Sequence, residues 1–324
     1  MRVLIAGLGS VGKRHLRNLL ALGVRELSAY RARGGSLEEL EGTLRTYTDL
    51  EAALEREHPQ AVLIANPTAL HLPVALAAAR HGCHLYVEKP LSNTLEGVGE
   101  LRAIVREKGL AVMVGCNLRF HPGYRRVKGL IAGGAIGHPL SARIEVGQYM
   151  PDWHPGEDYS LGYSARMALG GGAILTLIHE LDYAYDLFGD VTRVAACSIR
   201  ASNLETDVED LAEILLAFRS GMMATVHVDH VQRPASRSCK VVGEEGILTW
   251  DVLDETVTVD RGSKREVFED RFERNEMFLS ALHHFLDCVA LGKTPSPSLD
   301  EGCRVLEIAL AAKDAAASGC LVHV

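Results

Sequence analysis

The sequence predicts two domains of different architecture: an α/β domain with a parallel sheet, followed by an α+β domain with a mainly antiparallel sheet. In the first third of the chain, short apolar runs alternate with helical patterns, which is typical of a doubly wound parallel sheet. Further on, strand-like runs are joined by short turn-forming segments, which indicates hairpins. We place the domains at 1–119 and 120–324, with the final helix (299–318) a candidate to pack back on the first.

The amino-terminal stretch carries the most specific motif of the first domain. The apolar run 3–6 leads into Gly7, Gly9 and Gly12, spaced as G-x-G-x-x-G, and a helical pattern follows at once. The first glycine allows a tight turn, the second lets a pyrophosphate approach the backbone, and the third lets the helix pack on the strand. The free N–H groups at the helix start would then face a diphosphate. The motif therefore predicts a dinucleotide-binding loop.

The other elements of the first domain follow in order. Strands are expected at 26–30, 61–65, 85–88 and 111–116, and helices around 50–58 and at 72–80 and 94–108, the last capped by Gly109. Because the carboxyl ends of parallel strands share one edge, the residues that follow these strands should gather along one rim. Those residues are the glycine loop, Asn66, Pro67, Glu88, Lys89, Pro90 and Asn117.

The second domain begins with a different pattern. A helix at 122–133 and a strand at 140–148 precede an irregular segment, 149–168, and a glycine run (170–172) opens a helix that is expected to reach Phe188. Three predicted strand pairs flank short turns: 211–218 with 223–229, 240–242 with 247–251, and 257–260 with 264–268. Helices at 275–291 and 299–318 complete the sequence.

Composition limits the classes of partner. The net charge of −8 and the pI near 6.0 argue against nucleic acid or an anionic membrane surface as a main partner. Seven scattered cysteines without a C-x-x-C pair favour a reducing cytoplasm, and none has zinc-ligand spacing, so we expect no metal site. No apolar stretch is long enough for a membrane span.

Lys89 is the first candidate catalytic residue. It lies between Glu88 and Pro90 directly after a predicted strand, on the rim described above. A lysine near a bound nicotinamide can act as an acid or base on a substrate oxygen. Pro90 fixes the turn, where a cis bond is possible. The alternative, a surface lysine before a turn, has about equal weight.

His179 is the second candidate. His179 and Asp182 are three residues apart on one predicted helix face, so the carboxylate could orient the imidazole or hold a substrate. The residues around them are apolar, which indicates a buried helix. A satisfied polar pair in the core is therefore an equally good interpretation.

The segment 152–166 contains Trp153, His154, Tyr163 and Arg166. Aromatic and hydrogen-bonding groups in an irregular loop suit a polar, ring-shaped ligand such as a sugar. Alternatively, the aromatic side chains fill a seam between the domains.

The end of the second strand bears on the choice of cofactor. NAD sites usually place Asp or Glu there for the ribose 2′-hydroxyl, and none is present. Arg31 or Arg33 could instead pair with a 2′-phosphate, which favours NADP. The alternative is a pair of solvated arginines beside NAD.

Taken together, these motifs resemble the Gfo/Idh/MocA family of NAD(P)-dependent oxidoreductases, over essentially the whole chain. The resemblance lies in the glycine loop, Asn66-Pro67 with His71, Glu88-Lys89-Pro90, Arg119-Phe120, the block 170–182 and the closing region 295–319. Three further stretches, beginning at Trp153, Tyr163 and His179, are similar to a branch linked to bacterial surface-sugar pathways.

The resemblance implies a Rossmann domain and an open, mainly antiparallel sheet domain with helices on one face, with the active site between the two. It implies that Lys89 and His179 form the acid–base pair while hydride passes between nicotinamide and a secondary alcohol or ketone of a sugar, sugar nucleotide or cyclitol. A homodimer or homotetramer is expected. A non-catalytic dinucleotide-binding sensor of the same fold is the alternative.

The resemblance also implies two sets of binding residues. The cofactor set comprises Gly7, Gly9, Ser10, Val11, Gly12, Arg31, Arg33, Asn66, Pro67, His71, Glu88, Lys89 and Asn117. The substrate set comprises Arg119, Trp153, His154, Tyr163, Arg166, Thr176, His179 and Asp182.

The chain departs from the family pattern at one position. Many family enzymes carry an Asp one helical turn before the histidine, where this chain has Leu175 and Thr176. A threonine can hydrogen-bond a hydroxyl group, but it cannot act as a carboxylate base. The usual three-residue set is therefore incomplete at this position.

Overall fold

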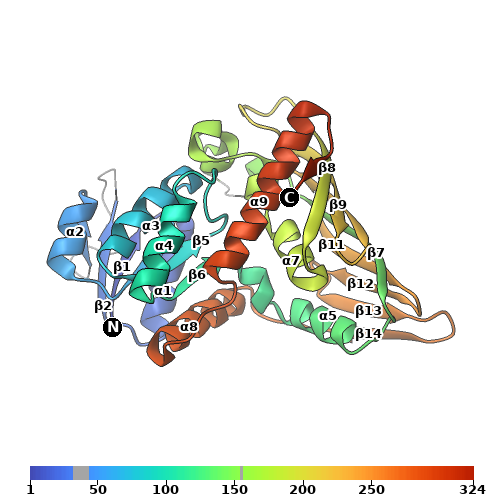
Figure 1. The fold of residues 1–324 in the computed structure, drawn as a ribbon, viewed down its shortest axis with the longest axis horizontal. Coiled ribbons are helices and arrows are strands. Elements are labelled where there is room, and N and C mark those ends of the chain that lie inside the picture. The colour runs from blue at the N-terminus through green and yellow to red at the C-terminus, as the bar shows by residue number, and fades with distance from the viewer. Residues whose placement is uncertain (32–43, 154–155) are drawn as a thin grey trace. The chain divides into compact units, whose positions relative to one another are not determined.

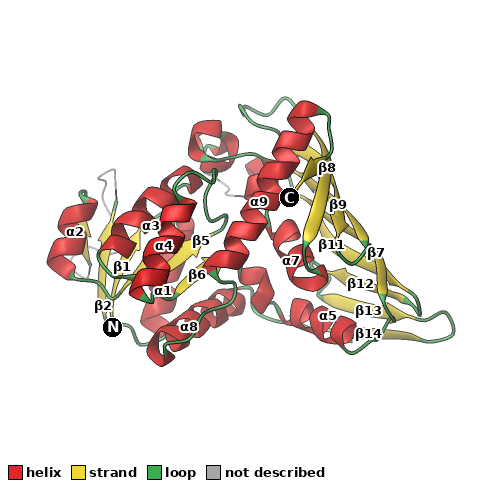
Figure 2. Cartoon of the chain, viewed as in Figure 1, coloured by secondary structure: helices red, strands yellow, loops and turns green. Residues whose placement is uncertain are grey.

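The computed structural model describes residues 1–31, 44–153 and 156–324. Two compact units divide the chain: residues 1–116 with 275–306, and residues 117–274 with 307–324. Each unit has its own sheet, of six and nine strands in the described ranges (Figures 1 and 2). None of the helices in these ranges combines the length and apolar character needed to span a bilayer.

The sheet of the first unit is parallel throughout, with the order β3-β2-β1-β4-β5-β6. Its strands are β1 (Arg2–Ala6), β2 (Glu26–Tyr30), β3 (Arg45–Tyr47), β4 (Ala61–Ile64), β5 (His84–Glu88) and β6 (Val112–Gly115). Strand order reverses between β1 and β4, which is where ligands bind in open sheets of this kind. The strands β4 and β6 are buried along their whole length, as expected for a sheet covered on both faces. The predicted α/β domain is therefore confirmed, although the short β3 was not predicted.

Helices cover both faces of this sheet. They are α1 (Ser10–Ala21), α2 (Leu50–Glu57), α3 (His71–Arg80), α4 (Val98–Lys108) and α8 (Asn275–Leu291). Helices α2, α3 and α4 contact one another in turn, whereas α1 contacts α8. Right-handed crossovers from β1 to β2 and from β4 to β5 run in opposite directions along the sheet, so α1 and α3 lie on opposite faces.

Helix α4 begins later than predicted. The sequence pattern suggested a start at residue 94, but Gly97 adopts a left-handed conformation (φ 81°), so the helix begins at Val98. At the other end Gly109, also left-handed (φ 63°), caps the helix as predicted.

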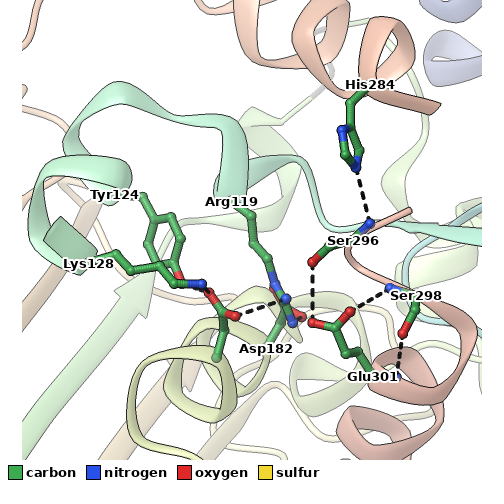
Figure 3. Close-up of polar contacts among 9 residues, drawn as sticks. Arg119, Tyr124, Lys128, Asp182, His284, Ser296, Ser298 and Glu301 are labelled. Atoms are coloured by element: carbon green, nitrogen blue, oxygen red, sulfur yellow. Dashed lines mark hydrogen bonds and ion pairs between the residues drawn. The ribbon is translucent and has the colours of Figure 1, made fainter. Parts of the chain in front are cut away.

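The amino terminus of α9 (Leu299–Ser318) is capped by its own side chains. The Ser298 N–H donates to Glu301 Oε2 at 2.7 Å, and the Glu301 N–H donates to Ser298 Oγ at 3.2 Å (Figure 3). This reciprocal pair is a capping box. Just before it, the Pro297 carbonyl accepts from the Val114 N–H of β6 at 3.0 Å, so the helix start is fixed beside that strand.

The glycine loop after β1 is shaped by backbone contacts. Gly7 has φ 99°, and a Cβ atom there would lie 2.7 Å from the Asn66 nitrogen. A Cβ at Gly12 would lie 2.0 Å from the Gly7 carbonyl oxygen, but a Cβ at Gly9 would meet nothing within 4 Å. The first and third glycines are therefore required by packing, whereas the second faces open space.

The second unit contains a nine-stranded sheet with the order β14-β13-β12-β11-β7-β10-β9-β8-β15. Its strands are β7 (Pro139–Gly147), β8 (Val191–Ile199), β9 (Leu211–Phe218), β10 (Met223–Asp229), β11 (Ser236–Gly243), β12 (Ile247–Asp251), β13 (Thr256–Asp260), β14 (Arg265–Glu269) and β15 (Val322–His323). Among the described residues of this sheet, only β7 and β10 pair in parallel, and the other strand pairs are antiparallel. This confirms the predicted mainly antiparallel architecture.

One face of this sheet is covered by α5 (Pro122–Ala132), α6 (Ala173–Thr176) and α7 (His179–Phe188). Strand β7 alternates buried residues, such as Ile144 and Val146, with exposed ones, such as Arg143 and Glu145. On the open face, Leu215 and Met223 are exposed. The helices therefore lie on one face of an open sheet, as predicted.

The single helix predicted from the glycine run to Phe188 is wrong, because the structure has two helices there. Leu177 (φ −98°, ψ 31°) ends α6, and a new helix begins at His179. The residues at the break are as apolar as those around them, so the hydrophobic pattern does not reveal it. As a result, His179 is the first residue of α7 instead of a mid-helix residue.

The glycine run itself accommodates protein atoms. A Cβ at Gly171 would lie 2.4 Å from the Tyr163 carbonyl oxygen. A Cβ at Gly172 (φ 106°) would lie 2.4 Å from the Glu209 carboxylate, which pairs with Lys313 at 3.1 Å. The glycine run therefore allows other parts of the chain to approach its backbone closely.

We predict that Gly12→Ala lowers the free energy of unfolding by roughly 1–3 kcal/mol, because the new methyl group overpacks the contact with the Gly7 carbonyl. The matched control is Gly99→Ala, in the first turn of α4, where a Cβ would meet nothing within 4 Å. That change should stabilise the protein by about 0.5–1 kcal/mol. Urea unfolding of both variants checks the pair, and equal effects would contradict it.

Candidate functional site

The carboxyl ends of β1, β2 and β4 meet at the glycine loop. The Gly7 N–H donates to the Tyr30 carbonyl at 2.9 Å, and the Ala65 N–H donates to the Ala6 carbonyl at 2.8 Å. Arg31 follows Tyr30 directly, which places it at the same edge as the loop. Arg33, its predicted companion, lies outside the described residues.

This edge has the features that a dinucleotide requires. Gly9 is the N-cap of α1 and contributes no side chain, and Ser10 and Val11 are not buried. The first N–H groups of a helix have no partner within it, so they can bind an anion. The side-chain oxygen of Asn66 is buried and accepts no hydrogen bond from the described residues. These groups fit the phosphates and polar edges of a dinucleotide.

The predicted rim residues of β4 and β5 also meet. Lys89 is half-buried, and the Lys89–Pro90 peptide bond is cis, as the sequence allowed. His71 is buried, with Nδ1 2.8 Å from the Pro90 carbonyl and Nε2 2.8 Å from the Asn66 carbonyl. Burial lowers the pKa of His71, although the two backbone contacts oppose that shift.

In the second unit, His179 is buried at the start of α7. Leu175 and Thr176, at the end of the preceding α6, are also buried. Asn117 and Arg119 lie in the short helix η2 (Asn117–Phe120), which directly follows Cys116 and contacts α7. The unit therefore brings together His179, Thr176, Arg119 and Asp182 from the predicted substrate set on neighbouring elements.

Helix α7 is held by buried carboxylates. Asp182 accepts two hydrogen bonds from Arg119, from Nε at 2.9 Å and from Nη2 at 2.7 Å (Figure 3). Asp186, one turn later, accepts from Arg119 at 3.1 Å, from Lys128 at 2.7 Å and from the Tyr124 hydroxyl. The two-pronged pair of Arg119 and Asp182 is of the strong, geometrically specific kind.

The charges around Asp186 shift the pKa values of their neighbours. Burial raises the pKa of Asp186, but the cations of Arg119 and Lys128 and the Tyr124 hydroxyl outweigh it, and the net shift is downward. Burial and the neighbouring Asp186 carboxylate raise the pKa of Tyr124. Asp186 is therefore held as an anion between its partners.

A third carboxylate of the same helix was missed by sequence reasoning. Glu180 is fully buried and accepts from Arg237 of β11 at 2.8 and 3.0 Å. A signal for it does exist in the sequence. Glu180 has the apolar residues Ile178 and Leu181 close by in the sequence, and a charge buried there requires a partner because an unpaired buried ion is costly. The identity of that partner, 57 residues later, leaves no local trace in the sequence.

In the loop that was predicted to bind a sugar, packing accounts for part of the aromatic content. Trp153 is half-buried against a small core of Met150, Ala165 and Leu204, with its ring 5.1 Å from that of His230. Its indole Nε1 is buried and has no hydrogen-bond partner in the described part of the chain.

Of the other members of that loop, Tyr163 is half-buried in a short helix, and Arg166 Nε donates to the Ser160 carbonyl at 2.5 Å. His154 lies outside the described residues. Within the described ranges, no three His, Cys, Asp or Glu side chains are grouped to hold a metal ion.

Comparison with known proteins gives consistent matches over most of the chain. The model for an oxidoreductase family with an NAD-binding Rossmann fold matches residues 1–116, and the model for the GFO/IDH/MocA C-terminal domain matches residues 124–249. Among individual relatives, myo-inositol 2-dehydrogenase of Thermotoga maritima is 28% identical, covering 97% of this chain and 95% of its own. The scyllo-inositol 2-dehydrogenase (NAD(+)) of Bacillus subtilis is 29% identical, covering 98% and 95%.

A solved structure shares the fold. Levoglucosan dehydrogenase, in complex with NADH and levoglucosan, superposes with a TM-score of 0.89 at 23% identity and covers 100% of this chain and 99% of its own.

We predict that Arg119→Met lowers the free energy of unfolding by roughly 3–5 kcal/mol, because it breaks a buried ion pair and removes both hydrogen bonds that Arg119 donates to the Asp182 carboxylate. The control is Lys128→Met, which removes a half-exposed partner of Asp186 and should cost less than about 1 kcal/mol. Chemical denaturation of both variants provides the comparison. A loss below about 1 kcal/mol for Arg119→Met would refute the role assigned to the buried pair.

Proposed function

The chain belongs to the Gfo/Idh/MocA oxidoreductase family, and from that premise we propose which residues transfer a hydride between a nicotinamide dinucleotide and a substrate. The reaction interconverts a secondary alcohol and a ketone. The observation that best supports the site is the glycine loop at the reversal of strand order, where a Cβ at Gly9 would meet nothing.

The dinucleotide would be held by the glycine loop and by Asn66 at the end of β4. When bound, its nicotinamide accepts or supplies the hydride. The family is one of NAD-binding proteins. We propose a preference for NADP, because Arg31 stands at the end of β2, where an acidic residue would normally select NAD.

We propose that Lys89 and His179 carry out the acid–base chemistry. In the oxidation direction, His179 takes the proton of the substrate hydroxyl, and the Lys89 ammonium group stabilises the charge that develops on the same oxygen. In the reverse direction, His179 returns that proton. Thr176 replaces the family carboxylate only as a hydrogen-bonding group, so these two residues would work without a third.

The substrate would be a sugar or cyclitol. The names of the two dehydrogenase relatives favour an inositol as the substrate. A sugar nucleotide is also included in the proposed substrate class. Trp153, His154, Tyr163 and Arg166 are proposed to contact its ring.

For Arg119 and Asp182 we propose an indirect role in substrate binding. Both oxygens of Asp182 already accept hydrogen bonds from Arg119. The pair would therefore act by holding α7, and His179 with it, in place.

One observation favours a second candidate function, that of a dinucleotide-binding sensor without catalysis. The position one turn before His179 is Leu175, which is buried and has no ionisable group. A sensor would still bind the dinucleotide, and it would transfer no hydride to any member of a sugar and cyclitol panel.

We also propose a homodimer or homotetramer in the cytoplasm. The open face of the nine-stranded sheet exposes Leu215 and Met223 and would provide the contact between subunits. The seven cysteines all lie in the described ranges and form no disulfide, including the exposed Cys197 and Cys320, which suits a reducing compartment.

We predict that Lys89→Ala lowers kcat at least about 100-fold, the usual range for losing an acid–base group. The assay would follow nicotinamide absorbance with myo-inositol, scyllo-inositol and levoglucosan. Lys108→Ala, which removes an exposed lysine at the end of α4, should leave kcat unchanged. Near-normal turnover of the Lys89 variant would exclude the proposed role.

We predict that Arg31→Ala raises the Kd for NADPH roughly 10-fold or more and changes that for NADH little, because a charged hydrogen bond to the 2′-phosphate contributes about 1.5–3 kcal/mol. Fluorescence titration with each reduced cofactor measures the two constants. Arg17→Ala, an exposed arginine on α1, serves as the charge control. Equal changes for both cofactors would contradict a preference set at Arg31.

A further inference from the structure

Two buried histidines contact the residues on either side of Lys89. Before it, Glu88 Oε1 lies 2.6 Å from Nε2 of His15, which belongs to α1. After it, the Pro90 carbonyl lies 2.8 Å from Nδ1 of His71, which belongs to α3. The turn at the end of β5 is thus contacted from both faces of the sheet.

The hydrogen bond between His15 and Glu88 has a defined donor and acceptor. A carboxylate can only accept, so His15 donates from Nε2. His15 is fully buried, and its Nδ1 has no hydrogen-bond partner in the described ranges. The rings of Tyr86 and Phe278 lie edge-on to the imidazole, at 5.2 and 6.2 Å between centroids. This packing leaves the ring little freedom, so the Glu88 carboxylate is held at a defined point.

The second contact joins two strand ends. The Nε2 atom of His71 lies 2.8 Å from the Asn66 carbonyl, so one imidazole contacts both the turn after β4 and the turn after β5. Both carbonyls are acceptors, so the neutral ring, with its single N–H, donates to one of them, and the protonated ring donates to both. His71 is almost fully buried, where a hydrogen bond is electrostatically stronger than in water. Movement of the Pro90 carbonyl would therefore break a contact that no solvent can replace.

We propose that His15 and His71 are positioning residues that fix the backbone on both sides of Lys89 and thereby aim its side chain. The inference rests on the proposed catalytic role of Lys89. A displacement of about 1 Å at a catalytic group can reduce the rate up to about 100-fold, so such contacts matter to catalysis without touching the substrate.

The two contacts of His71 can be separated by substitution. The side-chain nitrogen of Asn reaches about as far as Nδ1 of His, and that of Gln about as far as Nε2. His71→Asn therefore keeps a donor for Pro90, whereas His71→Gln keeps one for Asn66. We expect kcat to fall roughly 10- to 100-fold in His71→Gln and less than about threefold in His71→Asn, with substrate KM little changed in both.

Two substitutions of His15 allow a similar comparison. His15→Gln places an amide donor near Glu88 and should retain most of kcat. His15→Leu removes the donor and should lower kcat by a factor comparable to that of His71→Gln. The control is His84→Leu, at the opposite end of β5, where the imidazole accepts from the Ala111 N–H at 3.0 Å. That variant loses a histidine contact on the same strand and should keep its kcat.

A double-mutant cycle distinguishes aiming of Lys89 from general damage. In the Lys89→Ala background, His71→Gln should change the residual kcat less than about twofold, because residues that act as a unit are not additive. Independent damage would multiply the two losses and overturn the proposal. Near-normal activity of Lys89→Ala alone would instead refute the proposed function, and the positioning role with it.

Amide hydrogen exchange supplies a readout without substrate. Residues 91–93 should exchange faster in His71→Gln and His15→Leu than in the unmodified protein, and at the unmodified rate in His84→Leu. Unchanged exchange in both variants, or equal kcat for His71→Asn and His71→Gln, would show that the turn does not depend on these histidines.

Discussion

The contact between Gly12 and the Gly7 carbonyl is the constraint on which the first unit depends. A Cβ at residue 12 would lie 2.0 Å from that oxygen, so α1 can approach β1 only without a side chain there. Close approach of α1 brings His15, one turn further along the helix, to Glu88 at the end of β5. A single missing methyl group thus determines how a helix contacts a strand that lies two places away in the sheet.

The contacts at this edge form a closed ring. Gly7 lies against the start of the turn after β4, whose Asn66 carbonyl meets His71. From His71 the ring passes through Pro90 to Glu88 and returns through His15 to the helix that holds Gly12. A closed ring resists distortion better than separate contacts, because displacement of one member strains the others. It suits an edge that must present several groups to one ligand.

Local patterns in the sequence predicted a large part of this structure. The glycine spacing, the strand that precedes Lys89 and the hairpins of the second sheet all depend on residues close together in the chain, and the structure contains them. The partners of buried charges were not predictable in this way. Arg237 reaches Glu180 from a strand 57 residues later, and nothing near either residue identifies the other. The break before His179 was hidden because its residues are as apolar as their neighbours.

Within the six residues of the glycine loop, some positions are constrained by folding and one is constrained by ligand binding. Changes at residues 7 and 12 disturb the packing of the chain, so they would be removed wherever folded protein is required. Residue 9 is not constrained by packing, because a Cβ atom there would meet no protein atom within 4 Å. Screens based on expression level or protease resistance would therefore pass variants at residue 9 unnoticed, and only a screen for ligand capture would register their loss.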